Sequence, residues 1–212
     1  ELVSRQGGKL GALVRAGRPH QWVKNLLLAV PLVLGHRADE AALWLNLLIA
    51  FLAMGLCASA VYLVNDLLDL RSDRLHPTKC RRPLAAGTLP IPLALAAAPT
   101  AVLAALLLAW LTLPPLFVGA LLFYTASAWL YSLAVKGKAM LDVIWLACLY
   151  VLRIILGGLA VEIPPTAWLL AFALFMFLSL AFAKRYSELR LLEGTTTLGP
   201  GGQAVFEYRW SG

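Results

Sequence analysis

The sequence contains few charged residues and, among them, few acidic ones. Only 14% of its 212 residues carry a charge, 11 of them acidic and 18 basic, whereas 61% are hydrophobic. A soluble domain of this length cannot cover so much apolar surface with so little charge. Long apolar runs are instead typical of membrane-spanning helices. We therefore predict an all-α integral membrane protein, folded as a helical bundle.

Cysteine is also scarce. The three cysteines, Cys57, Cys80 and Cys148, show neither the spacing of a zinc site nor a pairing pattern. Cys57 and Cys148 lie inside apolar runs, where a thiol is most simply a packing residue. The sequence therefore indicates no disulfide framework and no zinc centre.

Charged residues divide the chain into six apolar stretches. At ~1.5 Å rise per residue most of them can cross a bilayer, and the first, interrupted by Pro31, is near the lower limit of length. We expect a single bundle over residues 21–190, with an arm at 1–20 before it and a flexible tail at 191–212 after it. The predicted spans are 22–35, 41–64, 92–111, 116–133, 141–161 and 166–183.

Basic residues gather on one side of this topology. That side receives the N-terminal arm, the loops 65–91 and 134–142, and the segment after 183, whereas the opposite connections carry only Arg37. The positive-inside rule makes the basic side cytoplasmic. We expect a multi-pass protein of the cell (inner) membrane with its active site facing the cytoplasm. Nucleic acid is not an expected partner, because these cations are next to the membrane and no binding module accompanies them.

Three aspartates follow the second apolar stretch directly. Asp66, Asp69 and Asp73 are spaced i, i+3, i+7, which places them on one face if the helix continues. Converging carboxylates repel one another unless a cation lies between them. Mg²⁺ prefers such oxygen ligands and shares its shell with substrate phosphates. With Asn65 beside them, they predict a Mg²⁺ site, although a solvated helix end is the simpler alternative.

One cation lies within a predicted span. Arg153 is about twelve residues into the stretch 141–161, near the middle of the membrane. A charge at this depth costs several kcal/mol and usually faces a bundle interior or a polar cavity. We expect Arg153 to line a cavity and to meet an anionic substrate or a buried carboxylate.

Other candidate residues have a simpler alternative role. His76, before Pro77, either contacts phosphate or closes a turn. Tyr131 either contacts substrate or lies at the membrane interface, as many tyrosines do. Lys24, Lys136 and Lys138 either neutralise phosphates or anchor the helix ends.

The motif Asn65-Asp66-x-x-Asp69-x-x-x-Asp73 resembles the first aspartate-rich motif of the UbiA superfamily of intramembrane prenyltransferases. Within it, the chain is most similar to decaprenyl-phosphate phosphoribosyltransferases. That closer similarity is carried by residues 18–25, by 76–83, and by Tyr131-Ser132 followed by Lys136 and Asp142. It extends over roughly residues 15–190.

The resemblance implies a reaction between two phosphorylated substrates. A 5-phosphoribosyl group would pass from phosphoribosyl diphosphate to a polyprenyl (decaprenyl-type) phosphate lipid, for a cell-envelope arabinan precursor or a related lipid-linked sugar. It implies Mg²⁺ as cofactor, with Asn65, Asp66, Asp69 and Asp73 as ligands and Lys79 as a further catalytic residue. The implied substrate-binding residues are Lys24, Asn65, His76, Arg82, Tyr131, Lys136, Lys138, Asp142 and Arg153.

The sequence departs from the superfamily pattern in two ways. Members usually carry a second motif, Asp-x-x-x-Asp, where this chain has Lys136, Lys138 and a lone Asp142. Two cations and one carboxylate suit phosphate better than a second metal cluster, which favours phosphoribosyl transfer. Members also usually have nine helices, whereas six are expected here, so we expect either a truncated chain or an incomplete bundle.

Two alternatives remain open. One is a UbiA-type aromatic prenyltransferase that uses a polyprenyl diphosphate and needs the second carboxylate pair. The other is a non-catalytic cation-binding membrane protein or transporter, against which the basic residues at 76–83 argue. A homo-oligomer is compatible with the sequence but is not indicated by it.

Overall fold

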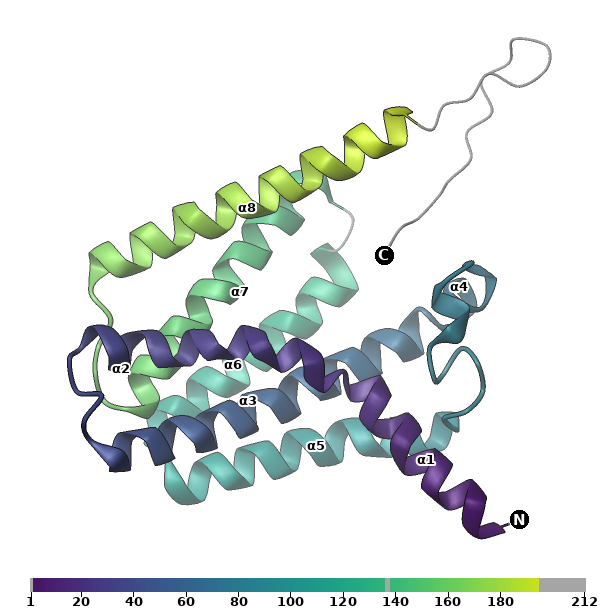
Figure 1. The fold of residues 1–212 in the computed structure, drawn as a ribbon, viewed down its shortest axis with the longest axis horizontal. Helices are drawn as coiled ribbons and strands as arrows, with labels where there is room; N and C mark the ends of the chain where they lie inside the picture. The colour runs from purple at the N-terminus through teal and green to yellow at the C-terminus, as the bar shows by residue number, and fades with distance from the viewer. Residues whose placement is uncertain (1, 136–137, 195–212) are drawn as a thin grey trace.

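The computed structural model describes residues 2–135 and 138–194, and every regular element in these ranges is a helix (Figure 1). Five helices are long and apolar enough to cross a membrane: α3, α5, α6 with η3, α7 and α8. The predicted all-α membrane bundle is therefore confirmed. In chain order the elements are α1 (Leu2–Gly17), η1 (Pro19–Ala29), α2 (Val30–Leu34), α3 (Ala41–Leu68), α4 (Leu70–Leu75), η2 (Lys79–Arg81), α5 (Ile91–Thr112), α6 (Pro115–Leu130), η3 (Tyr131–Val135), α7 (Ala139–Ala160) and α8 (Ala167–Gly194).

The first expected span, 22–35, differs from the prediction, because it is not a continuous α-helix. Its place is taken by the 3₁₀-helix η1 and the short α-helix α2, so the described residues contain five long α-helical spans rather than six. A 3₁₀-helix rises about 2.0 Å per residue, against 1.5 Å in an α-helix. The two elements together therefore extend about 30 Å, close to the thickness of the hydrocarbon core.

Two glycines allow η1 to lie directly against its neighbours. A Cβ atom at Gly157 of α7 would overlap the backbone of Leu28, and one at Gly55 of α3 would lie 2.6 Å from the Trp22 ring. Neither position has room for a side chain. The close packing of η1 against α3 on one side and α7 on the other therefore stabilises its 3₁₀ geometry. The sequence of η1 alone does not predict this packing.

α3 is the central helix of the bundle, and small residues form much of its interface with α5. Ala53, Ala60, Ala98 and Ala105 are all buried. Small side chains let membrane helices approach closely. By contrast, α8 lies on the outside against α7 (Figure 1) and exposes large apolar side chains such as Trp168, as expected of a helix that faces lipid.

The connections alternate between the two ends of the bundle. The arm, α4 and the end of α6 lie at one end, whereas α2 and the α5–α6 turn lie at the other (Figure 1). The loops that are rich in cations therefore share one end, as the sequence predicts; which side of the membrane this end faces stays a prediction. α8 continues to Gly194, so residues 191–194 of the expected tail are helical, and 195–212 lie outside the described residues.

Candidate active site

The aspartate motif lies at the junction of α3 and α4. α3 ends at Leu68 and α4 begins at Leu70, with Asp69 between them. The Asp69 N–H donates to the Asn65 carbonyl (2.9 Å), and the Asp73 N–H donates to the Asp69 carbonyl (2.8 Å). Because these bonds keep the spacing of an α-helix, Asp66 and Asp73 stay on one side of the chain.

Two arginines meet this pair of aspartates. The Arg82 Nη1 lies 2.7 Å from the Asp73 Oδ2 and 3.4 Å from the Asp66 Oδ1, and the Arg18 Nη2 lies 2.5 Å from the Asp66 Oδ1. We call Arg18, Asp66, Asp73 and Arg82 the arginine–aspartate network. In the part of the chain that the structure describes, no three Asp, Glu, His or Cys side chains gather as a metal site. The expected convergence of three carboxylates is therefore replaced by ion pairs.

Two oxygens at this junction nevertheless suit a hard cation. The Asn65 Oδ1 and the Asp66 Oδ2 are buried and have no hydrogen-bond partner. Buried polar atoms are nearly always paired, and amide and carboxylate oxygens are ligands that Mg²⁺ prefers. Asn65 and Asp66 therefore fit the expected Mg²⁺, with Asp69 and Asp73 close by in the chain.

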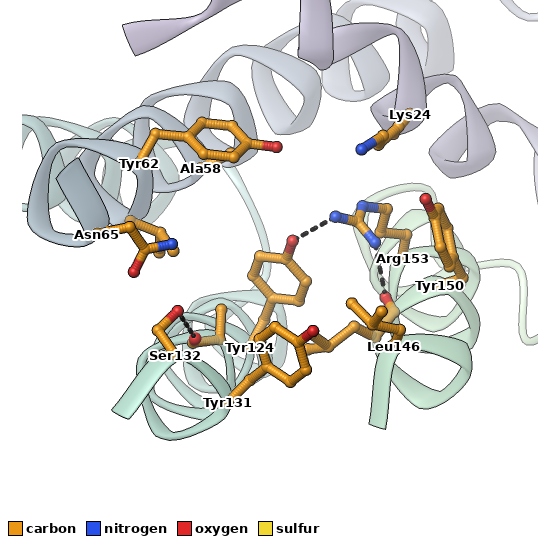
Figure 2. Close-up of a pocket in the computed structure, with 13 residues that line it drawn as sticks. Lys24, Ala58, Tyr62, Asn65, Tyr124, Tyr131, Ser132, Leu146, Tyr150 and Arg153 are labelled. Atoms are coloured by element: carbon orange, nitrogen blue, oxygen red, sulfur yellow. Dashed lines mark hydrogen bonds between the residues drawn. The ribbon is translucent and has the colours of Figure 1, made fainter. Parts of the chain in front are cut away.

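A cavity of about 130 Å³ lies beside the network, between α3, η1, α6 and α7 (Figure 2). Among the described residues, the charged side chains of its wall are those of Lys24 and Arg153, and no carboxylate lines it. We call it the tyrosine cavity, because four tyrosines contribute to its wall together with Asn65 and Ser132: Tyr62, Tyr124, Tyr131 and Tyr150. Two cations and several hydroxyl donors are groups that suit the oxygens of an anion.

Arg153 forms the deepest charged part of this wall. Its side chain is only 9% exposed. Nη2 donates to the Tyr124 hydroxyl (2.5 Å), and Nη1 donates to the Leu149 carbonyl (3.0 Å). The guanidinium also lies 5.1 Å from the Tyr124 ring centre and 5.0 Å from that of Tyr150. The structure thus holds the guanidinium rigidly against the cavity.

The positive charge of Arg153 is not balanced by a carboxylate of the described residues. Among the described residues no ion pair joins it to a carboxylate, and its Nε has no hydrogen-bond partner. A buried guanidinium without a carboxylate is expensive unless an anion compensates it. Of the two partners expected for Arg153, an anionic ligand is the one that this geometry favours.

The remaining expected residues that the structure describes do not line the cavity. The His76 Nδ1 accepts the backbone N–H groups of Thr78 (3.2 Å) and Lys79 (3.4 Å), which closes a turn. Lys138 is exposed, and the Asp142 Oδ1 is buried without a partner in the first turn of α7. Lys136 lies outside the described residues.

Several site residues were missed in the sequence: Arg18, Tyr62, Tyr124, Tyr150 and Ser132. For three tyrosines a helical signal was present. Tyr62 is three residues before Asn65, Tyr150 is three residues before Arg153, and Tyr124 is seven residues before Tyr131. Each pair therefore shares a helix face. The helical spacing from Asn65, Arg153 and Tyr131 thus indicates these three tyrosines as further residues of the same site. For Arg18 the signal was its place at the start of residues 18–25, one of the segments that carry the family resemblance.

Comparison with known proteins identifies relatives of this chain. The model of the UbiA prenyltransferase family matches residues 26–195. A decaprenyl-phosphate phosphoribosyltransferase of Mycobacterium tuberculosis is 40% identical over 92% of this chain and 66% of its own length. The nodulation protein NoeC of Azorhizobium caulinodans is 39% identical over 84% of this chain and 57% of its own length. This chain thus spans 66% or less of both relatives.

A solved structure shares the fold. A UbiA homologue from Archaeoglobus fulgidus, bound to DMAPP and Mg²⁺, superposes with a TM-score of 0.70 at 21% sequence identity. The match covers 85% of this chain and 65% of the archaeal chain. At this identity the likeness concerns the arrangement of the helices.

Proposed function

The chain belongs to the UbiA prenyltransferase family, and from this premise we propose that it is a membrane phosphoribosyltransferase. It transfers the 5-phosphoribosyl group of phosphoribosyl diphosphate to a polyprenyl phosphate and releases diphosphate. The mycobacterial relative of this name supports the proposal. Because the chain spans 66% of that relative's length, the activity of the whole protein is part of the proposal.

The tyrosine cavity is the observation that carries this proposal. Both substrates are phosphorylated, and the charged residues of the cavity wall are Lys24 and Arg153. The side chains of Tyr62, Lys24 and Arg153 surround one space in Figure 2, with the Tyr124 hydroxyl held by Arg153. A phosphate in this space receives two cations and phenolic O–H donors, which are strong partners for its oxygens.

The bonding changes need little chemistry from side chains. An oxygen of the lipid phosphate forms a bond to the anomeric carbon of the ribose, while the bond from that carbon to diphosphate breaks and diphosphate keeps the electron pair. The lipid phosphate is already an anion near neutral pH, so no general base is required. The main task of the protein is to place the two substrates and to stabilise the charge on the leaving diphosphate.

The residues of the junction are proposed to hold Mg²⁺. The Asn65 Oδ1 and the Asp66 Oδ2 offer the oxygens without partners, and Asp69 and Asp73 are the further ligands that the motif predicts. When bound there, Mg²⁺ supplies positive charge to the diphosphate. Arg82 and Lys79 are proposed phosphate contacts on the same loop. His76, Lys136, Lys138 and Asp142 stay predicted substrate contacts.

Aromatic prenyl transfer is the competing function within the family. It uses a second carboxylate pair, and residues 134–142 supply only Asp142. No carboxylate of the described residues lines the cavity, which also favours a site in which protein cations meet phosphates directly. The cytoplasmic orientation of this site follows from the positive-inside rule and is proposed with it.

Membranes that contain the full chain provide the test. They are incubated with labelled phosphoribosyl diphosphate and a polyprenyl phosphate, with and without Mg²⁺, and the lipid is extracted. We expect label in the lipid only when Mg²⁺ is present, and none with Asp66→Asn. Arg37→Gln is the matched control, because Arg37 pairs with Glu40 in an exposed turn. Prenyl transfer from polyprenyl diphosphate to 4-hydroxybenzoate would instead support the competing function.

A further inference from the structure

The arginine–aspartate network is balanced in charge. Asp66 and Asp73 contribute two negative charges, and Arg18 and Arg82 contribute two positive charges within 3.4 Å of them. The Asp66 Oδ1 receives both arginines, whereas its Oδ2 has no partner. The carboxylates that are proposed to hold Mg²⁺ are thus already neutralised by the protein itself, and a divalent cation must compete with two guanidinium groups.

Burial differs sharply between the two halves of the network. The side chains of Asp66 and Asp73 are 3% and 4% exposed, whereas those of Arg18 and Arg82 are 24% and 26% exposed. The aspartates are therefore fixed in the protein, while the arginines reach water with part of their side chains. If the arginines leave the carboxylates for another anion, the arginine side chains can move into water while the buried carboxylates stay where they are.

Arg18 lies in a strained turn that directs its side chain toward Asp66. It links α1 to η1 with a left-handed backbone (φ 50°, ψ 58°), which residues other than glycine rarely adopt. The Ser59 hydroxyl of α3 donates to the Gly17 carbonyl (2.8 Å) and accepts the Trp22 indole N–H (3.1 Å). These bonds hold the strained turn against α3 at Ser59, about two helical turns before Asp66.

Arg18 also contacts a residue of the tyrosine cavity wall. Its guanidinium lies 5.0 Å from the centre of the Tyr62 ring, and Tyr62 and Asn65 form part of the cavity wall. A phosphate that enters the cavity therefore comes close to an arginine that now neutralises Asp66. Guanidinium groups bind phosphate as readily as carboxylate, so an anion offers Arg18 an alternative partner.

We propose that Arg18, together with Arg82, is an internal counter-ion that keeps the metal site closed to cations until a diphosphate binds. The diphosphate draws the arginines from the carboxylates, and the freed Asp66 then takes the divalent ion. The two ligands consequently bind with positive coupling, and by linkage each raises the affinity for the other. This inference rests on the proposed function, because it concerns the metal and the diphosphate of that reaction.

Direct metal binding tests this coupling without catalysis. The detergent-solubilised full chain is equilibrated with Mn²⁺ alone at about pH 8, where carboxyl groups are ionised, and protein-bound metal is separated by ultrafiltration. We expect weak binding by the wild type and roughly tenfold tighter binding by Arg18→Gly, because one competing charge is removed. Glycine keeps the left-handed turn. Inorganic diphosphate should tighten Mn²⁺ binding by the wild type more than by Arg18→Gly.

Three variants make the result decisive. Arg18→Lys keeps the charge and should bind Mn²⁺ like the wild type, as should Arg37→Gln, whereas Asp66→Asn should bind none at this site. Equal binding by Arg18→Gly and the wild type, with both proteins folded by thermal melting, overturns the proposal, and so does tight wild-type binding without diphosphate. If the wild type binds no Mn²⁺ even with diphosphate, the metal role in the proposed function fails as well.

Discussion

At the scale of the residue, the site is a meeting of charges whose partners come from distant parts of the sequence. Asp66 pairs with Arg18, 48 residues earlier, and with Arg82, 16 residues later. Arg153 finds a hydroxyl, a carbonyl and two aromatic rings, but no carboxylate among the described residues. Hydrogen bonds and ion pairs thus fix both side chains, while the Asp66 Oδ2 and the Arg153 Nε have no partner in the protein.

Substitution of Arg153 tests the anion site. Arg153→Leu should insert and fold, because leucine suits a membrane helix, but should lower phosphoribosyl transfer about 100-fold, since a charged hydrogen bond contributes up to ~3 kcal/mol. Arg153→Lys keeps the charge but loses the planar fork, and should raise KM for the phosphorylated substrate more than it lowers the amount of folded protein. Transfer rates are measured against protein quantified in the membrane.

The assignment of Arg153 has a clear counter-result. If Arg153→Leu retains the full wild-type rate, the guanidinium is a packing side chain, and the anion site lies elsewhere. Leu141→Ala is a suitable control, because Leu141 is 52% exposed on the same helix and does not line the cavity.

At the scale of the element, the 3₁₀-helix η1 is the unusual part of the bundle. It carries Lys24 to the tyrosine cavity and packs between α3 and α7. A run of eleven residues is long for this helix type, whose hydrogen bonds are poorer than those of an α-helix. Its conformation therefore depends on the close approach that Gly55 and Gly157 allow.

Glycine substitutions test that dependence. Gly157→Ala places a methyl group into the Leu28 backbone, and we expect it to destabilise the protein by about 1–3 kcal/mol, as overpacking does. It should also weaken anion binding, since the shift of η1 carries Lys24 with it. Gly119→Ala is the matched control, because nothing lies within 4 Å of the added Cβ in α6. Thermal melting in detergent compares the two.

The two glycine variants should shift the melting temperature in different ways. Gly119→Ala should leave the melting temperature unchanged or raise it, because alanine is the better helix former. Equal melting temperatures for the two variants would show that η1 adapts without cost, and the packing argument would then be wrong.

At the scale of the whole molecule, the bundle has one end rich in cations, whereas the connections at the other end carry a single cation, Arg37, with three acidic residues. The junction of α3 and α4, the loop after α4 and the start of α7 lie at this cation-rich end (Figure 1). α8 supports the cavity from outside, since the Phe177 ring stacks on Tyr150 at 4.7 Å. The candidate site therefore lies at the same end of the bundle as the loops that are rich in cations.

Cysteine labelling tests the orientation. Residues 70–90 and 134–140 should be cytoplasmic, whereas 36–40 and 162–165 should face the other side, because cations are retained on the cytoplasmic side. Single cysteines at positions 39 and 138 are introduced into a background without Cys57, Cys80 and Cys148. An impermeant maleimide should label position 39 rapidly in intact cells and position 138 only after permeabilisation. Rapid outside labelling at position 138 contradicts the predicted topology.

The sequence by itself determined the class of this protein and the positions of four membrane-spanning helices. Hydrophobic length and charge position are properties of composition, so they predict α3 and α5 to within a few residues, and likewise α6 and α7. The cost of a charge in the membrane similarly placed Arg153 on a polar wall. The spacing of the aspartates placed Asp66 and Asp73 on one side of the chain.

Only the tertiary structure decided how these parts meet. η1 is a 3₁₀-helix because two glycines on other helices leave room for it, and no local pattern in residues 19–29 encodes that contact. Arg18 neutralises Asp66 because a strained turn lies against Ser59, far away in the sequence. Local sequence encodes helix length and burial, whereas pairing of charges depends on distances between helices, which exist only after the bundle has packed.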